Sequence, residues 1–159
     1  MVVLSDTHAK RLDDLPAMIL KDLEEADWII HAGDYTSAIF LEQLRGLGNF
    51  TGVHGNMDSA EIQGELPDKD IVEIHGVRIG IAHPSEGGSP FGLKERVKSK
   101  LGADLDMIIY GHSHKPANEK EGGTIYFNPG SATGAFPARY KTYGVLRIEG
   151  EIEREIVRV

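Results

Sequence analysis

The chain of 159 residues contains no cysteine, and its 25 acidic and 17 basic residues give a formal net charge of −8 with histidine neutral. The lack of cysteine excludes thiolate catalysis, cysteine-ligated zinc and iron–sulfur clusters. The acidic balance argues against long nucleic acid and anionic membranes as partners. The composition predicts one soluble domain over residues 1–159. Nothing in the first residues resembles a signal peptide, and no apolar stretch approaches the ~20 residues of a membrane span, so a cytoplasmic location is expected.

The first third of the chain alternates short apolar strands with segments of helical spacing. The expected elements are a strand at Val2–Leu4, a helix over Asp14–Ala26, a strand at Trp28–His31, a helix over Ser37–Leu47 and a strand at Phe50–Val53. This β-α-β-α-β order is typical of parallel strands joined by crossover helices.

The order of elements changes after this region, because β-hairpins replace most of the crossover helices. Strands are expected at Ile71–Ile74, Val77–Ala82, Met107–Tyr110, Thr124–Phe127, Thr142–Ile148 and Glu151–Val157, with one basic helix around Leu93–Leu101. Parallel crossovers followed by antiparallel hairpins predict a two-sheet α/β sandwich.

Polar side chains follow five of these strands at their carboxyl ends. Val2–Leu4 is followed by Asp6 and His8, Trp28–His31 by Asp34, Phe50–Val53 by Asn56, Val77–Ala82 by His83, and Met107–Tyr110 by His112 and His114. In α/β sheets the loops at the carboxyl ends of the strands converge, and ligands bind there. Gly33, Gly55 and Gly111 precede three of these groups and permit sharp turns. Each short motif alone is common, but together they predict a single site.

The donor set of four histidines, two aspartates and one asparagine suits divalent metals such as Mn²⁺, Fe²⁺, Zn²⁺, Co²⁺ or Ni²⁺. Seven ligands are too many for one open catalytic centre, but they suit two cations that share a carboxylate. Two such ions about 3.5–4 Å apart can hold the attacking and leaving oxygens of a displacement at phosphorus. They would also attract a small phosphate ester to an acidic protein.

These residues resemble the ordered motifs of calcineurin-like metallophosphoesterases. The motifs are Ser5-Asp6-Thr7-His8, Gly33-Asp34, Gly55-Asn56-Met57-Asp58, His83 and Gly111-His112-Ser113-His114. The segments 111–116 and 128–131 resemble the small YfcE-type phosphodiesterases, a branch related to the retromer subunit of eukaryotes. The resemblance covers Met1 to about Ser131 and implies a four-layer αββα sandwich of two mixed sheets flanked by helices.

The resemblance also implies how the ligands divide between two metals. One metal would be held by Asp6, His8, Asp34 and His114, and the other by Asp34, Asn56, His83 and His112, with Asp34 bridging. Asp34, Asn56 and His83 would act in catalysis through the metals. Phosphodiesters would be hydrolysed by in-line attack of a metal-bridging hydroxide. Mn²⁺ is the first metal expected, with Ni²⁺, Co²⁺, Zn²⁺ and Fe²⁺ as alternatives.

Two positions depart from the family pattern. Met57 stands where larger relatives carry a histidine, and a thioether cannot donate a proton, so the general acid is not identified. Pro84 follows His83 where the family usually has glycine, and it restricts His83 to extended geometry.

Asp58, His31 and His54 are expected to support the ligands without binding metal.

Three functions are compatible with this resemblance. The leading hypothesis is a two-metal phosphodiesterase for small phosphodiesters, with phosphomonoesters as weaker substrates. The second is a non-catalytic scaffold for protein contacts, as in the retromer subunit. The third, a nuclease for long nucleic acid, is disfavoured by the charge of −8. Whether the protein forms a homo-oligomer is left open.

Overall fold

The computed structural model describes residues 1–102 and 104–159, which form two mixed five-stranded sheets. The strands are β1 (Val2–Leu4), β2 (Ile29–Ala32), β3 (Phe50–Val53), β4 (Lys69–Ile74), β5 (Val77–Ala82), β6 (Met107–Tyr110), β7 (Ala117–Glu121), β8 (Thr124–Asn128), β9 (Thr142–Glu149) and β10 (Glu151–Arg158). The first sheet has the order β10-β9-β1-β2-β3, and the second has the order β4-β5-β6-β8-β7.

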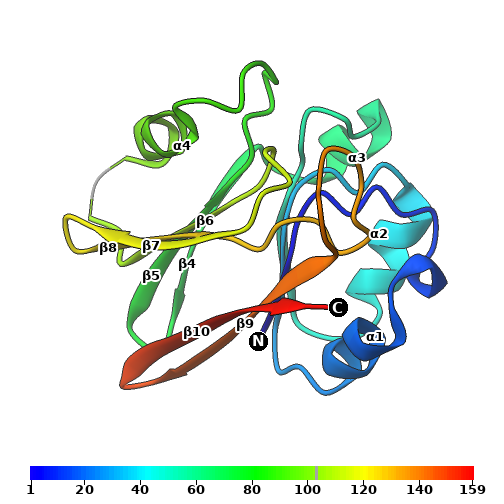
Figure 1. Ribbon diagram of the computed structural model, residues 1–159, viewed down its shortest axis with the longest axis horizontal. Coiled ribbons are helices and arrows are strands. Elements are labelled where there is room, and N and C mark those ends of the chain that lie inside the picture. Colours follow the sequence, from blue (N-terminus) through cyan, green and yellow to red (C-terminus); the bar gives the residue numbers. More distant parts are fainter. Residues whose placement is uncertain (103) are drawn as a thin grey trace.

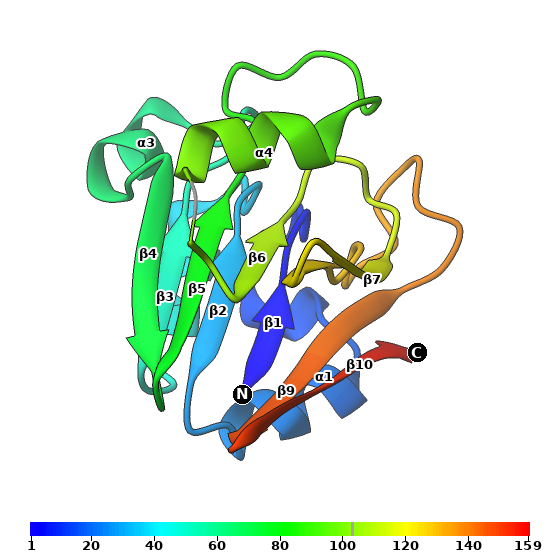
Figure 2. The same cartoon turned by 90° about the vertical axis from the view of Figure 1, so that its left-hand side faces the viewer.

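Each sheet combines a parallel core with antiparallel hairpins. β1, β2 and β3 are parallel in the first sheet, and β5, β6 and β8 are parallel in the second. The pairs β4–β5, β7–β8 and β9–β10 are antiparallel. The parallel strands β1, β2, β5 and β6 all point toward the same end of the molecule (Figure 2). Their following loops therefore meet at one end.

Helices cover the outer faces of both sheets. The helices are α1 (Ala17–Glu24), α2 (Ala38–Arg45), α3 (Ala60–Glu65) and α4 (Leu93–Leu101), with a short 3₁₀ helix at Leu12–Asp14. Figure 1 shows α1, α2 and α3 on one side of the molecule and α4 on the other, with the sheets between them. This arrangement is the predicted four-layer αββα sandwich. No helix in the described parts of the chain is long and apolar enough to cross a bilayer.

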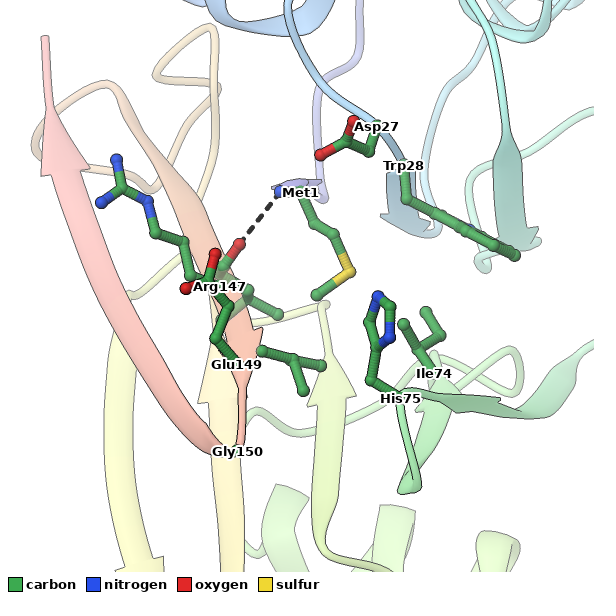
Figure 3. Close-up of a pocket in the computed structure, with 10 residues that line it drawn as sticks. Met1, Asp27, Trp28, Ile74, His75, Arg147, Glu149 and Gly150 are labelled. Atoms are coloured by element: carbon green, nitrogen blue, oxygen red, sulfur yellow. Dashed lines mark hydrogen bonds between the residues drawn. The ribbon is translucent and has the colours of Figure 1, made fainter.

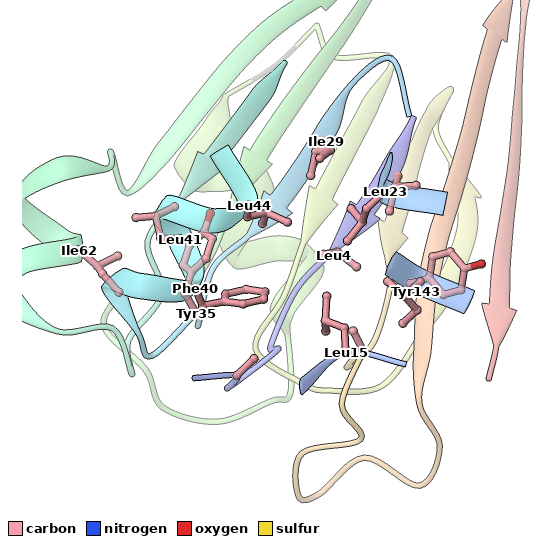
Figure 4. Packing of buried hydrophobic residues seen from close by; sticks show 14 of the residues in the cluster. Leu4, Leu15, Leu23, Ile29, Tyr35, Phe40, Leu41, Leu44, Ile62 and Tyr143 are labelled. Carbon is pink, nitrogen blue, oxygen red and sulfur yellow. The ribbon is translucent and has the colours of Figure 1, made fainter. Parts of the chain in front are cut away.

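The alternation of side chains along β1 explains the layering. Val2 and Leu4 pack with the apolar residues of α1 and α2, whereas Val3 packs in the cluster between the two sheets. Successive side chains of a strand point to opposite faces, so even a three-residue strand contributes to two cores. Figure 4 shows the outer cluster, in which Leu23, Phe40 and other buried side chains surround Leu4.

The first helix differs most from the sequence expectation in extent, and the helix α3 and the strand β7 were not expected. The first helix begins at Ala17 instead of Asp14, because Pro16 at its N-cap fixes the chain entry and holds Leu15 extended. The helix α3 contains only six residues, and it was missed. The strand β7 was also missed, because nearly all of its side chains are polar and exposed and show no alternation.

A hollow of about 460 Å³ lies at the amino-terminal ends of the parallel strands. It is lined by Met1, Trp28, His75 and residues at the end of β9 and in the β9–β10 turn, and the amino group of Met1 donates to the Leu146 carbonyl at 2.9 Å (Figure 3). The predicted ligands follow the carboxyl ends of the strands, so this hollow lies at the opposite end of the sheets from them.

Candidate metal centre

All seven predicted donors lie in loops at the carboxyl ends of five parallel strands. Asp6 and His8 follow β1, Asp34 follows β2, Asn56 follows β3, His83 follows β5, and His112 and His114 follow β6. The first four come from the first sheet and the last three from the second. The donors therefore meet at the seam between the sheets.

Four of these side chains form one compact group. Asp6, His8, Asp34 and His114 each place a possible ligand atom within 4.8 Å of the other three. That span is close to twice the ~2.0–2.2 Å ligand distance of a divalent transition metal. His114 Nε2 lies 3.5 Å from Asp6 Oδ1, and His8 Nε2 lies 3.8 Å from Asp34 Oδ2.

The other three donors form a second group beside the first. Asn56 Oδ1 lies 3.2 Å from His83 Nε2 and 3.0 Å from His112 Nδ1. His83 Nε2 is also 3.5 Å from Asp34 Oδ2. Asp34 therefore contacts both groups, through His8 on one side and His83 on the other. Pro84 does not turn His83 away from the site, because the buried imidazole of His83 faces the Asp34 carboxylate.

Backbone carbonyls set the orientation of three of the imidazoles. The Ala32 carbonyl accepts from His83 Nδ1 at 2.7 Å, and the Ala135 carbonyl accepts from His114 Nδ1 at 2.9 Å. A carbonyl only accepts, so in the neutral rings these nitrogens carry the proton and each Nε2 has a free lone pair. In His112 the roles are reversed, because Nε2 donates to the Gly88 carbonyl at 3.0 Å. The free lone pairs face the oxygens of Asp6, Asp34 and Asn56.

A cation between facing acceptors in a buried site would satisfy them and balance the charge of the carboxylates. Asp6 and Asp34 are almost fully buried, and within residues 1–102 and 104–159 neither pairs with a lysine or arginine. Burial, with the nearby Asp34 charge, raises the pKa of Asp6 well above its usual value. Burial lowers the pKa of His8 and His83. His8 Nε2 is a buried nitrogen with no hydrogen-bond partner among the described residues. The donor set therefore fits divalent cations.

Five of the seven donors have left-handed backbone geometry. Their φ values are 48° for Asp6, 46° for His8, 62° for Asp34, 85° for His112 and 54° for His114. Such geometry in residues other than glycine costs on the order of 1–3 kcal/mol each and occurs preferentially at functional sites. The geometry is held by backbone bonds between the loops, including those from the Asp6 N–H to the Gly33 carbonyl and from the His8 N–H to the Asp34 carbonyl.

The three glycines that precede ligand motifs are required for different reasons. Gly33 has a φ of 93°, as expected for a sharp turn, and a Cβ there would also lie 2.6 Å from His83 Nδ1. Gly55 and Gly111 do not have positive φ. A Cβ on Gly55 would overlap the Asp34 carboxylate, and one on Gly111 would lie 2.8 Å from the Ala32 carbonyl oxygen. Close approach of loops, not turn geometry, requires glycine at these two positions.

Asp58 holds the loops after β2 and β3 together. Its carboxylate accepts from the backbone N–H groups of Gly55 at 2.7 Å, Thr36 at 2.8 Å and Asp34 at 3.0 Å. The Met57 N–H donates to Asp34 Oδ1 at 2.8 Å, while the Met57 side chain is exposed. Asp58 is thus placed to orient Asp34 through the backbone.

The two other predicted supporting residues have different environments. His31 is fully buried, accepts from the Gly33 N–H through Nδ1 at 3.2 Å and contacts Thr7 Oγ1 through Nε2 at 3.1 Å. It lies behind the loops that carry Asp6 and Asp34. His54 instead contacts the Gly55 carbonyl and, through its backbone N–H, the Pro67 carbonyl. Among the described contacts, His54 touches none of the seven donors.

Several further groups shape the site, and the sequence indicated their segments but not their individual contacts. Ser5 donates to the Asp6 carboxylate at 2.8 Å, and Ser131 donates to the Asp6 carbonyl at 2.7 Å. Asn128 links its own turn to the loop after β6, through Gly111 and Ser113. The sequence contains a signal for Ser5 and Ser131, because both lie in the motifs. It contains none for the carbonyls that orient the histidines, since every residue has one.

Two mixed sheets between helices, with aspartate, asparagine and histidine donors at the carboxyl ends of the strands, define a metallophosphoesterase fold. The sequence matches the calcineurin-like phosphoesterase superfamily domain over residues 1–151, and the chain belongs to that superfamily. Membership agrees with the motif series that suggested it.

Related proteins support the same class along the whole chain. A probable metallophosphoesterase of Methanocaldococcus jannaschii is 32% identical over 161 residues, covering 99% of this chain and 80% of that protein. A phosphodiesterase of the same organism is 29% identical over 167 residues, covering 98% of this chain and 96% of that protein. Among solved structures, Vps29 of Entamoeba histolytica in complex with Zn²⁺ is 25% identical, with a TM-score of 0.74, and covers 99% of this chain and 97% of that one.

Proposed function

We propose that this protein is a phosphodiesterase that uses two divalent metals to hydrolyse small phosphodiesters, with phosphomonoesters as weaker substrates. The observation that carries the proposal is the position of Asp34, whose carboxylate contacts both donor groups. Asp6, His8, Asp34 and His114 would hold one cation. Asp34, Asn56, His83 and His112 would hold the other. Mn²⁺ is the first candidate, and Ni²⁺, Co²⁺, Zn²⁺ and Fe²⁺ suit the same donors.

The residues of the chain contribute mainly through preorganisation. Bound divalent cations would polarise water and the phosphoryl oxygens of the ester. The carbonyls of Ala32, Ala135 and Gly88 hold three histidines with their free nitrogens toward the site, so no ring needs to turn when the site is used. The loop hydrogen bonds of Asp58 hold Asp34 between the two groups.

The alternative function is a scaffold for protein contacts, which we consider because the chain is similar to Vps29. A scaffold needs only the outer surface of the fold. It does not need seven converging donors, two buried carboxylates and five strained donor residues. A catalytic metal site would account for the free-energy cost of these features, so catalysis is the favoured function.

Hydrolysis of bis(p-nitrophenyl) phosphate tests the proposal. We expect turnover to require Mn²⁺ or another of the named cations and to fall at least about a hundredfold in Asp34→Asn, which keeps the shape of the side chain but removes its charge. Asp13→Asn is the matched control, because Asp13 is an exposed aspartate in the 3₁₀ helix. Absence of turnover with all five metals, or full turnover in Asp34→Asn, would contradict the proposal.

A further inference from the structure

A second hollow opens directly beside the candidate metal centre. It has a volume of about 630 Å³ and is lined by residues of three loops, which precede α4, follow β6 and precede β9. His114 belongs to its lining and to the first donor group. A molecule whose phosphorus lies at the donor groups can therefore extend one of its arms past His114 into this hollow.

The walls of the hollow present flat apolar surfaces to solvent. Phe91 is 85% exposed and Tyr140 is 48% exposed, and Pro90 and Pro137 lie beside them in the lining. Apolar and aromatic side chains that gather in one exposed patch are typical of surfaces that contact a ligand or partner. The guanidinium of Arg158 lies 3.3 Å from the centroid of the Tyr140 ring and supports it. These surfaces suit stacking with a planar aromatic group.

The hollow also contains two cationic side chains, Lys115 and Arg139. Within the described segments 1–102 and 104–159, neither forms an ion pair with a carboxylate, whereas Lys94, Arg96 and Lys100 all do. Two unpaired cations at one position in a protein of charge −8 create a local site for a negative group.

We propose that this hollow binds the ester arm of the substrate and selects an aromatic group that carries a negative charge. The proposal rests on the proposed function, because the phosphorus of the same ester must lie at the metal centre. Phe91 and Tyr140 would stack with the ring, and Lys115 and Arg139 would bind its charge. Phosphodiesters with an aromatic, anionic arm are therefore the expected substrate class, in preference to esters with small alkyl arms.

Calorimetric binding of single-armed phosphonates to the Mn²⁺-loaded protein tests this assignment without turnover. The four probes are methylphosphonate, cyclohexylphosphonate, phenylphosphonate and 4-carboxyphenylphosphonate. We expect phenylphosphonate to bind about tenfold more tightly than methylphosphonate and several-fold more tightly than cyclohexylphosphonate. The carboxylate should add about threefold at low salt, and this gain should disappear in ~0.5 M salt because exposed charges are screened.

Variants assign the two parts of the preference. Phe91→Ala should reduce the phenyl-to-methyl affinity ratio from about tenfold to about twofold. The double variant Lys115→Gln/Arg139→Gln should abolish the gain from the carboxylate while the phenyl-to-methyl ratio remains. Phe136→Ala is the matched control, since Phe136 is 94% exposed in the same loop as Arg139 and does not line the hollow.

The outcomes separate this inference from the proposed function. Equal affinity for all four probes, or an unchanged ratio in Phe91→Ala, would overturn the assignment of the hollow while the metal centre stands. A Mn²⁺-loaded protein that does not bind methylphosphonate would overturn the proposed function, and the assignment of the hollow with it.

Discussion

His31 illustrates how one buried side chain can support the site without contacting a ligand. Its ring stacks on Tyr35 with 3.8 Å between centroids, and its two nitrogens join the loops after β1 and β2. Burial, with smaller effects from His83 and His8, lowers the pKa of His31 well below its usual value. The neutral ring is therefore part of the folded structure near neutral pH.

This pKa shift predicts a pH-dependent loss of stability. Below about pH 6.5 the unfolded chain binds a proton at His31 that the folded protein does not bind, so the free energy of unfolding falls as the pH falls. Urea unfolding of the metal-free protein should show a loss from this residue of about 1 kcal/mol between pH 6.5 and 5.5. His31→Gln, which cannot titrate, should lack this part of the loss. Identical pH dependence in the two proteins would contradict the assignment.

The loops between strands and helices place the donors by close approach. Gly55 connects β3 to the turn before α3, and it leaves no room for a side chain beside Asp34. Gly64 lies only nine positions later inside α3, and a Cβ there would meet no atom within 4 Å. Replacing glycine by alanine should therefore destabilise the protein at position 55 and stabilise it at position 64.

Gly55→Ala should displace Asp34 or its loop, destabilising the protein by about 1–3 kcal/mol and reducing Mn²⁺-dependent hydrolysis at least tenfold. Gly64→Ala should stabilise the protein by about 0.5–1 kcal/mol, because alanine favours the helix. Urea unfolding and the p-nitrophenyl assay measure both effects. The interpretation would fail if Gly55→Ala retained full activity and stability.

The two sheets meet at the proposed metal centre, which draws on both of them. Asp6, His8, Asp34 and Asn56 follow strands of the first sheet, while His83, His112 and His114 follow strands of the second. Cations held there would connect the two sheets. They would also balance the charges of Asp6 and Asp34, whose burial is costly without a partner. Metal binding and global stability should therefore be linked.

Thermal unfolding should reveal this linkage directly. A metal at about a hundred times its dissociation constant adds ~2.7 kcal/mol, which corresponds to an increase of roughly 5–10 °C in the unfolding midpoint for a protein of this size. We expect Mn²⁺ to raise the midpoint, EDTA to reverse the increase, and Asp34→Asn to lose most of it. Asp13→Asn should respond like the wild type. A midpoint that does not respond to any of the named metals would argue against a metal centre.

Local signals in the chain were sufficient for most of the architecture. The strands Phe50–Val53, Val77–Ala82 and Met107–Tyr110 were predicted with the bounds that the structure has, because short apolar runs between turn residues favour buried strands. The convergence of donors from Asp6 to His114 was also predictable, since parallel strands bring their following loops to one end of a sheet. Both inferences need only chain order and side-chain type.

Other features depend on contacts between distant segments, and these carry no local signal. The polar strand β7 exists because it pairs with β8, and the Gly88 carbonyl reaches His112 across the space between two loops. The hollow beside His114 forms only where three loops meet, so the spacing of the residues in the sequence does not show that Phe91 and Arg139 line it together. Side-chain type and spacing therefore reveal which donors are available. Long-range packing sets the orientation of those donors and the shape of the space beside them.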